Sequence, residues 1–285
     1  GGNLVFFRPS TGEVILKIDG ENRRVVFPPE SGIKVEAAAT SGKIYVDTEG
    51  SDTAGNGNST APYASLTKAL SMVTTARKNV LIRGGDYDEA DAVAWPDVNG
   101  VVLKAVEGDV VITSEASTTH VIGIDPAAAS GTWSATLDGI EIENGDGQIG
   151  LQVDNSAVKK RINLYLKDFT GSISGDTPGA SIDINRSGGA GDAIRVYADG
   201  RGNTIEGLVT VITESTDDRF RFKGYRLVGG LTVAGAVACE VALFQCGLLA
   251  APTVDGANLL SNIGCWLETD ENPNIYTALA DHYDT

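Results

Sequence analysis

The sequence predicts an all-β protein. Valine, isoleucine and threonine are common, and they come with 35 glycines and one methionine, a composition that favours strands and turns over packed helices. From Asn79 onwards, short stretches of alternating apolar and polar residues recur between turns rich in Gly, Asp, Asn and Ser. No helical pattern of useful length lies between these stretches, which argues against alternating strand and helix units.

Residues 1–40 form the first predicted part of the chain. Three strand-like stretches, LVFF, EVILKI and RRVVF, are separated by turn residues at short spacing, which predicts a small β-meander. A ribbon of this size is marginal alone and needs another surface to pack on. The unbroken apolar run at LVFF is either buried against a partner chain or folded back on its own chain. The candidate attachment and oligomer-contact residues are Leu4, Val5, Phe6, Phe7, Val14, Leu16, Val25, Val26 and Phe27.

A single amphipathic helix is predicted at Pro62 to Ala76. Its apolar stripe has the spacing i, i+3, i+4 and i+7, formed by Leu66, Ala69, Leu70 and Val73. Proline suits the first turn of a helix, and Thr60 or Ser65 is the candidate N-cap.

The order of the elements around this helix carries a family resemblance. A strand ending in Asp (Ile44–Asp47) leads to a Gly-Ser-Asp turn (Gly50–Asp52), the Pro-led helix, and a strand (Val80–Ile82) running into Gly85-Asp86-Tyr87. This order resembles the opening of pectin-lyase-like right-handed parallel β-helices. The resemblance implies a single-stranded right-handed parallel β-helix, a solenoid, over residues 41–268, with the helix as its N-terminal cap. It implies nothing specific about chemistry, because such folds host many functions.

A repeat is visible near the end of the chain. Cys246 and Cys265 lie 19 positions apart in similar contexts, Gln-Cys-Gly-Leu and Gly-Cys-Trp-Leu. A repeat of roughly 20–25 residues suits one coil of three strands and predicts about eight coils between residues 43 and 267. Leu137, Leu164 and Ile184 are expected to point inward in rows. Residues 269–285 form an acidic tail that either frays or crosses to a neighbouring chain.

The net charge of −16 excludes broad classes of partner. Nucleic acids and anionic membranes attract cationic faces, so neither nucleic-acid binding nor membrane insertion is expected. The basic clusters at 159–161 and 219–226 are interpreted as charged sheet surface. The amino terminus lacks a secretion signal pattern and no stretch approaches ~18 apolar residues, so assembly in a reducing cytoplasm is expected. Cys239, Cys246 and Cys265 show no metal-binding spacing and are interpreted as buried apolar residues.

The candidate catalytic residues are Asp217, Asp218 and Lys223. Their stretches, TDDR and RFK, faintly resemble two elements of the polygalacturonase-like hydrolases, which use clustered Asp residues for acid and base work. The two Asp residues are adjacent, however, and adjacent residues on a strand point to opposite faces. A structural role is therefore the favoured interpretation, and no catalytic residue is assigned. His120 has no nearby nucleophile constellation and is interpreted as structural.

An oxygen-rich loop supplies the one candidate metal site. Asp47, Glu49, Asp52 and Asn56 offer hard ligands of the kind that calcium prefers. The loop lacks EF-hand spacing, so side-chain-to-backbone turns explain these residues better. No metal and no cofactor are expected. Scattered aromatic residues, including Tyr165 and Tyr197, would bind sugar rings if they lined one outer face, but filling of corners is the favoured interpretation.

Among β-helix proteins the chain is most similar to bacteriophage virion proteins, namely capsid decoration and tailspike-type proteins. The similarity lies in a small apolar N-terminal part, short loops and the lack of an assembled active site. It implies a non-enzymatic structural protein of the virion, a homotrimer that attaches to other virion proteins such as the capsid shell. The alternatives are a tailspike polysaccharide depolymerase, acting as lyase or glycoside hydrolase on host surface polysaccharide, and a carbohydrate-binding adhesin.

Overall fold

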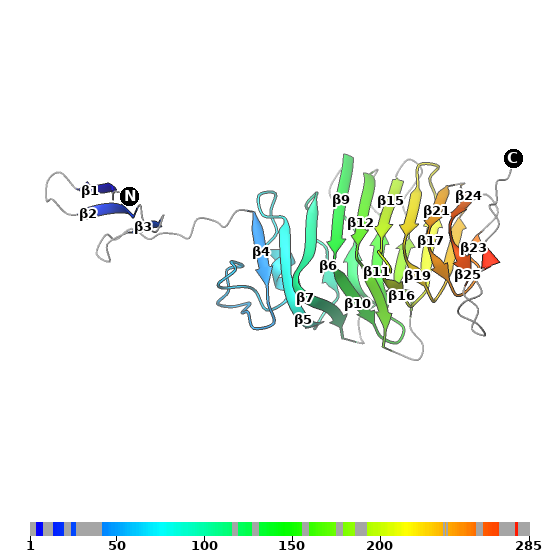
Figure 1. Cartoon of the computed structure of the whole chain (residues 1–285), viewed down its shortest axis with the longest axis horizontal. Coiled ribbons are helices and arrows are strands. Elements are labelled where there is room, and N and C mark those ends of the chain that lie inside the picture. Colours follow the sequence, from blue (N-terminus) through cyan, green and yellow to red (C-terminus); the bar gives the residue numbers. More distant parts are fainter. Residues whose placement is uncertain are drawn as a thin grey trace. The chain divides into compact units, whose positions relative to one another are not determined.

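A computed structural model gives the structure of the chain, which divides into two compact units, Gly1–Ser41 and Gly42–Thr285. Each unit is described here by itself (Figure 1). The structure describes residues 4–7, 14–19, 24–26, 42–115, 119–126, 131–155, 160–174, 179–185, 193–235, 237, 239–254, 259–267 and 277–278.

The first unit holds a three-stranded antiparallel sheet. Its strands are β1 (Leu4–Phe7), β2 (Val14–Asp19) and β3 (Arg24–Val26), paired in the order β1-β2-β3. The predicted attachment residues Leu4 to Phe7 form β1, Val14 and Leu16 lie in β2, and Val25 and Val26 lie in β3. Phe27 lies outside the described residues.

In its described residues the second unit is all-β apart from one short helix, and its strands pair in parallel except for the last one. One column of nine strands runs through it, in which each strand pairs with the next member of the column. The nine strands are β4 (Lys43–Val46), β5 (Asn79–Glu89), β7 (Val101–Ser114), β9 (Gly131–Asp138), β12 (Lys160–Lys167), β15 (Ala193–Asp199), β18 (Arg219–Lys223), β21 (Glu240–Phe244) and β24 (Leu259–Ile263).

Two further columns of strands complete the unit. Each strand from β8 to β22 pairs with the strand three places later in the chain. The second column joins the first through the long strand β7, and comprises β10 (Ile140–Asn144), β13 (Thr170–Ile173), β16 (Thr204–Ile205), β19 (Arg226–Leu227), β22 (Gly247–Leu248), β25 (Trp266–Leu267) and the antiparallel β26 (Thr277–Ala278). The third is a separate sheet of β6 (Val93–Ala94), β8 (His120–Ile124), β11 (Ile149–Asp154), β14 (Ile182–Asn185), β17 (Val209–Thr213), β20 (Leu231–Gly235) and β23 (Thr253–Val254). Figure 1 shows the successive strands of these columns side by side.

The core lies between the columns and is built from alternate residues of each strand. In the first column one inward row joins Leu103, Leu137, Leu166, Ala198, Phe222 and Leu243, each at most 4% exposed. The predicted inward residues Leu137, Leu164 and Ile184 are all buried. They do not share one row, because Leu164 pairs with Ala135 and Ile184 lies in the separate sheet.

The predicted repeat length of 20–25 residues holds for some of the repeats and not for others. Successive partners in the first column lie 36 residues apart at Tyr45 and Leu81 (81 − 45), but 19 apart at Phe244 and Ile263 (263 − 244). The chain returns to this column eight times within the described strands, which agrees with the predicted number of about eight repeats. The first repeat, from β4 to β5, is long because it contains the helix, whereas the next one spans 23 residues between Val80 and Leu103 (103 − 80).

The one helix in the described residues, α1, is shorter than predicted. It spans Leu66–Ser71 instead of residues 62–76, and it buries Leu66, Ala69 and Leu70. Ser65 is the N-cap, as predicted, because its hydroxyl accepts a hydrogen bond from the Lys68 amide. The helix ends at Ser71 with Met72 as its C-cap, and the β-branched residues that follow have a low helix propensity. No helix in the described part of the chain has the length and apolarity needed to span a bilayer.

The three cysteines are buried, as predicted. Cys239, Cys246 and Cys265 are at most 7% exposed and form no disulfide. Burial raises the pKa of the Cys239 thiol to about 12, and the hydrogen bond with Cys265 together with burial raises the pKa of Cys246. Burial also raises the pKa of Tyr87 to about 12.

These raised pKa values predict a loss of stability in alkaline solution. The folded chain holds the Cys239 and Tyr87 protons to higher pH than the unfolded chain, in which a cysteine titrates near ~8.5 and a tyrosine near ~10. Stability from these groups is therefore complete below about pH 8.5 and is lost as the pH rises toward about 12. We expect the free energy of unfolding in urea to fall between pH 8 and pH 10.5, with Cys239 contributing on the order of 1–2 kcal/mol. An equally steep fall in a Cys239→Ala variant would contradict this assignment.

Candidate functional site

The two adjacent candidate acids, Asp217 and Asp218, lie in opposite environments. Asp218 is fully buried, and its carboxylate accepts hydrogen bonds from the backbone amides of Ile194 at 2.8 Å, Ser215 at 3.0 Å and Glu214 at 3.2 Å. Asp217 is exposed, and its carboxylate lies 3.6 Å from the Arg161 guanidinium. The buried acid therefore holds backbone in place, and the pair does not form a shared acid and base arrangement.

Lys223, the third candidate, belongs to a different cluster. It is exposed at the end of β18, and its ammonium group lies 3.8 Å from the carboxylate of Asp199 on the neighbouring strand β15. The structure thus brings Lys223 together with Asp199.

Asp47, the first candidate metal ligand, has its oxygens occupied by protein groups. One oxygen accepts a hydrogen bond from the Glu49 amide at 3.0 Å, and the other accepts one from the Arg83 guanidinium at 2.7 Å. The bond from Arg83 holds the pKa of this carboxyl below its usual range. The Glu49 side chain is exposed.

Asp52 and Asn56, the other two candidate ligands, also bind backbone. Asp52 accepts hydrogen bonds from the amides of Ala64 and Ser65 and from the Ser65 hydroxyl, and so fixes the approach to α1. Asn56 accepts one from the amide of Asn58 at 3.0 Å, a local turn of the predicted kind. Among the described residues no group of three or more His, Cys, Asp or Glu side chains is placed to hold a metal ion.

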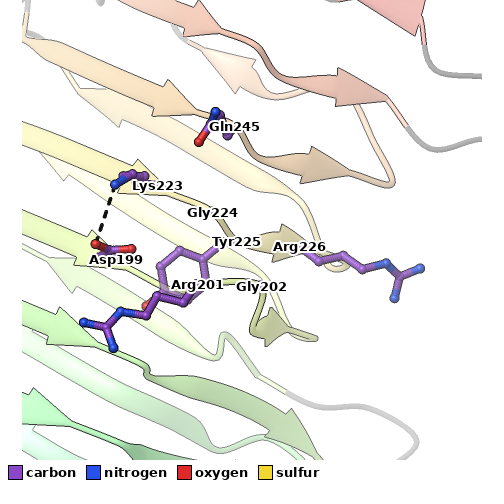
Figure 2. A pocket seen from close by; sticks show the side chains of 8 residues that line it. All are labelled: Asp199, Arg201, Gly202, Lys223, Gly224, Tyr225, Arg226 and Gln245. Atoms are coloured by element: carbon purple, nitrogen blue, oxygen red, sulfur yellow. Dashed lines mark ion pairs between the residues drawn. The ribbon is translucent and has the colours of Figure 1, made fainter.

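One cavity in the described part of the chain lies where β15 and β18 end. It has a volume of about 510 Å³ and is lined by Asp199, Arg201, Gly202, Lys223, Gly224, Tyr225, Arg226 and Gln245 (Figure 2). A second cavity of about 380 Å³ shares Asp199, Arg201 and Lys223 with it and continues over the outer face of the sheet. Its other lining residues are Tyr165, Leu166, Lys167, Tyr197, Ala198, Arg221 and Phe244. We call the two cavities together the basic groove.

The register of the parallel strands arranges the side chains of the basic groove in rows. One row joins Tyr165, Tyr197 and Arg221 across β12, β15 and β18. The two rings are half-buried and stacked, with centroids 5.4 Å apart and an angle of 15° between their planes. Paired strands lie ~4.8 Å apart, so in-register tyrosines stack directly.

A second row joins Lys104, Asp138, Lys167, Asp199 and Lys223, so that charge alternates from strand to strand. The lysines at its two ends are paired, Lys104 with Asp138 at 2.6 Å and Lys223 with Asp199 at 3.8 Å. The row gives this face a regular series of charged groups beside the tyrosines.

The turn after β15 shapes the larger cavity. Arg201 has a left-handed backbone (φ 50°), which projects its side chain into solvent, and its guanidinium lies 2.9 Å from Asp168 of the turn after β12. The Tyr225 ring lies against Gly200, where a Cβ atom would come within 2.6 Å of the ring. The ring is buried, so it forms part of the cavity floor instead of an exposed platform.

Sequence reasoning named some members of the basic groove, without bringing them together, and did not single out Lys167, Asp199 or Arg201. Tyr165 and Tyr197 were expected to fill corners, and the cluster at 219–226 was interpreted as sheet surface. The signal was a pattern of two residues, Tyr-x-Lys at 165–167, Tyr-x-Asp at 197–199 and Arg-x-Lys at 221–223. Because these pairs lie 32 and 24 residues apart (197 − 165 and 221 − 197), the uneven repeat hid their alignment.

A smaller cavity of about 260 Å³ lies beside the separate sheet and includes His120 and Trp95. Burial lowers the pKa of His120, and Nδ1 of its ring lies 3.0 Å from the Thr119 hydroxyl. Trp95 and Trp133 are buried, in keeping with the predicted filling of corners. The His120 ring therefore lies in this cavity with the Thr119 hydroxyl as its neighbour, and the expected structural role of His120 stays a prediction.

The geometry of the basic groove is that of a binding surface: stacked aromatic rings, a row of alternating charges and a rim of exposed arginines. Comparison with known proteins adds no family to this description. No protein-family model matches the chain, and no curated protein or solved structure is similar to it.

Proposed function

We propose that this chain is a non-enzymatic structural protein of a bacteriophage virion, a capsid decoration or short spike protein built as a right-handed parallel β-helix. The observation that carries the proposal is the column of nine parallel strands to which the chain returns eight times. A stack of this kind is stiff and grows along one axis, which suits projection from a surface.

The N-terminal unit is the proposed attachment segment. It is a separate compact unit with its own antiparallel sheet, and its first strand, LVFF, is entirely apolar. A three-stranded sheet gains stability by packing on another surface, and the capsid shell of the virion and the same segment in two further copies are the proposed surfaces. The protein is proposed to be a homotrimer that assembles in the host cytoplasm.

Helix α1 is the proposed cap of the β-helix. It contacts β4, β5 and β6, the first strands of the second unit, and it buries its apolar stripe there. The first coil of a stack has no preceding coil to cover its apolar interior, so a lid at this place supports the β-helix assignment.

Binding of the full chain to capsids that lack it tests the attachment. We expect a Leu4→Asp, Phe6→Asp variant to lose capsid binding in a co-sedimentation assay, because charges in an apolar docking strand oppose burial. A matched variant, Val106→Asp and Leu208→Asp, changes two side chains of the second unit that are each 38% exposed, and it should bind normally. Equal binding by both variants would refute the attachment assignment, and a monomeric mass in solution would refute the trimer.

A specific observation also favours a second function, binding of a carbohydrate by the basic groove. The stacked pair Tyr165 and Tyr197 is half-exposed on an outer face beside charged hydrogen-bonding groups. Aromatic surface flanked by polar groups is the usual composition of a sugar-binding site. A virion protein with such a groove would hold host surface polysaccharide as an adhesin.

A further inference from the structure

We infer that the basic groove selects an anionic glycan, one whose sugars carry carboxylate or sulfate groups. This inference rests on the carbohydrate-binding function proposed above and names the class of ligand. It is argued from the charges of the groove, from their register along the sheet and from the shape of the arginine side chains.

The charge of the groove is opposite to that of the chain. Its lining contains the five cations Lys167, Arg201, Arg221, Lys223 and Arg226, all exposed, and the single carboxylate Asp199, a net charge of 5 − 1 = +4. Counting also Asp168 and Glu240, which pair with Arg201 and Arg221, leaves 4 − 2 = +2. The whole chain carries a net charge of −16, so an anion is repelled less by this face than by the rest of the protein.

The arrangement of the groove fits an extended polymer. A chain lying across β12, β15 and β18 meets Lys167 on β12, Arg201 in the turn after β15, and Arg221 and Lys223 on β18. On β15 itself it meets Tyr197 and Asp199, and Asp199 is paired with Lys223. The tyrosine row runs beside the charged row and offers apolar ring surface to sugar rings. The two cavities are shallow neighbours that share three residues, which suits several consecutive sugars better than one small molecule.

The chemistry of the cations favours carboxylate or sulfate over neutral hydroxyls. Arg201 and Arg221 each present a planar fork that binds two oxygens of one anionic group. Their side chains are 69% and 50% exposed, so both reach a ligand in the groove. Figure 2 shows the Arg201 and Arg226 side chains extending in different directions. It also shows the ion pair that joins Lys223 of β18 to Asp199 of β15.

Binding of the full chain to four polymers tests the inference: carboxymethyl-dextran, alginate, dextran sulfate and unmodified dextran. We expect at least one charged polymer to bind at least tenfold more tightly than dextran by calorimetry at low salt, and the affinity to fall with added salt. A groove variant, Arg201→Gln with Arg221→Gln, should lose at least tenfold in affinity. The control, Lys43→Gln with Lys78→Gln, removes the same charge from β4 and from the turn before β5, at the far end of the sheet, and should bind within twofold of the unaltered chain.

The outcomes separate the inference from the function on which it rests. Equal binding of dextran and the charged polymers, weakened by Tyr197→Ala, would refute anion selection and keep the glycan function. No binding of any polymer would refute both. Equally tight binding of poly-glutamate would show a general polyanion surface and refute the glycan assignment. If the groove variant and the control variant weaken binding equally, the net charge of the chain and not the groove determines the affinity. That outcome also refutes the inference.

Discussion

Replacing Asp218 with alanine is expected to lower the free energy of unfolding by at least about 3 kcal/mol. The carboxylate is fully buried and accepts hydrogen bonds from three backbone amides, those of Ile194, Glu214 and Ser215. Alanine removes the acceptor and leaves these donors without it in a region closed to water, at a cost of about 1–3 kcal/mol for each buried group. The bond to Ile194 also joins the turn before β18 to the start of β15, one repeat earlier.

Asp217 supplies the matched control for this prediction. It is the neighbouring residue, and its exposed carboxylate makes a long ion pair, 3.6 Å, with Arg161. Asp217→Ala should change stability by less than about 1 kcal/mol. Urea unfolding followed by two probes, together with hydrogen exchange of the Ile194 amide, measures both variants, because a stacked array unfolds in parts as well as globally. Similar losses in the two variants would contradict the structural role of Asp218.

The all-β class and the burial pattern could be predicted because both are local properties of the sequence. Alternation along a strand fixes which side chains face the core, so Leu137, Leu164 and Ile184 were placed inside correctly. The buried cysteines and the Ser65 cap follow from residue chemistry in the same way.

The alignment of the strands could not be predicted, because it depends on the length of every turn between them. Successive partners in the first column are 36 to 19 residues apart, and a fixed repeat of about 20–25 residues cannot align such strands. The stacking of Tyr165 on Tyr197 is a consequence of this alignment, as is the bond between Asp218 and the Ile194 amide. The arrangement of the basic groove could therefore not be predicted from the sequence, although its tyrosine, lysine and arginine residues are printed in it.

Helix α1 also has some features that neighbouring residues determine and others that residues distant in the sequence determine. Its apolar stripe and its cap are local, and both were predicted. Its start is fixed from a distance, because Asp52 holds the Ser65 amide and Glu89 of β5 holds the amides of Leu66 and Thr67. No acidic residue lies in the first turn of the helix itself, so the usual sequence signal for such an interaction is absent.

Replacing Glu89 with alanine is accordingly expected to lower the free energy of unfolding by about 2–4 kcal/mol. Glu89 is 4% exposed, and its two oxygens accept hydrogen bonds from the amides of Leu66 at 2.6 Å and Thr67 at 3.1 Å. Ser65 satisfies the next amide, that of Lys68, so the first turn of α1 depends on both residues. Without Glu89 two amides lose their acceptor. The helix also loses the favourable interaction between this carboxylate and its positive N-terminal end.

The contrast with Asp86 makes this prediction specific. Asp86 lies on the same strand but is exposed, so Asp86→Ala removes the same charge and should change the free energy of unfolding by less than about 0.5 kcal/mol. In the Glu89→Ala variant, hydrogen exchange should accelerate first at Leu66 and Thr67, and limited proteolysis should cut within residues 62–76. Because α1 packs on β4, β5 and β6, a helix that detaches exposes the apolar side chains it covered. Unchanged protection of these amides would mean that another group holds the helix against the sheet.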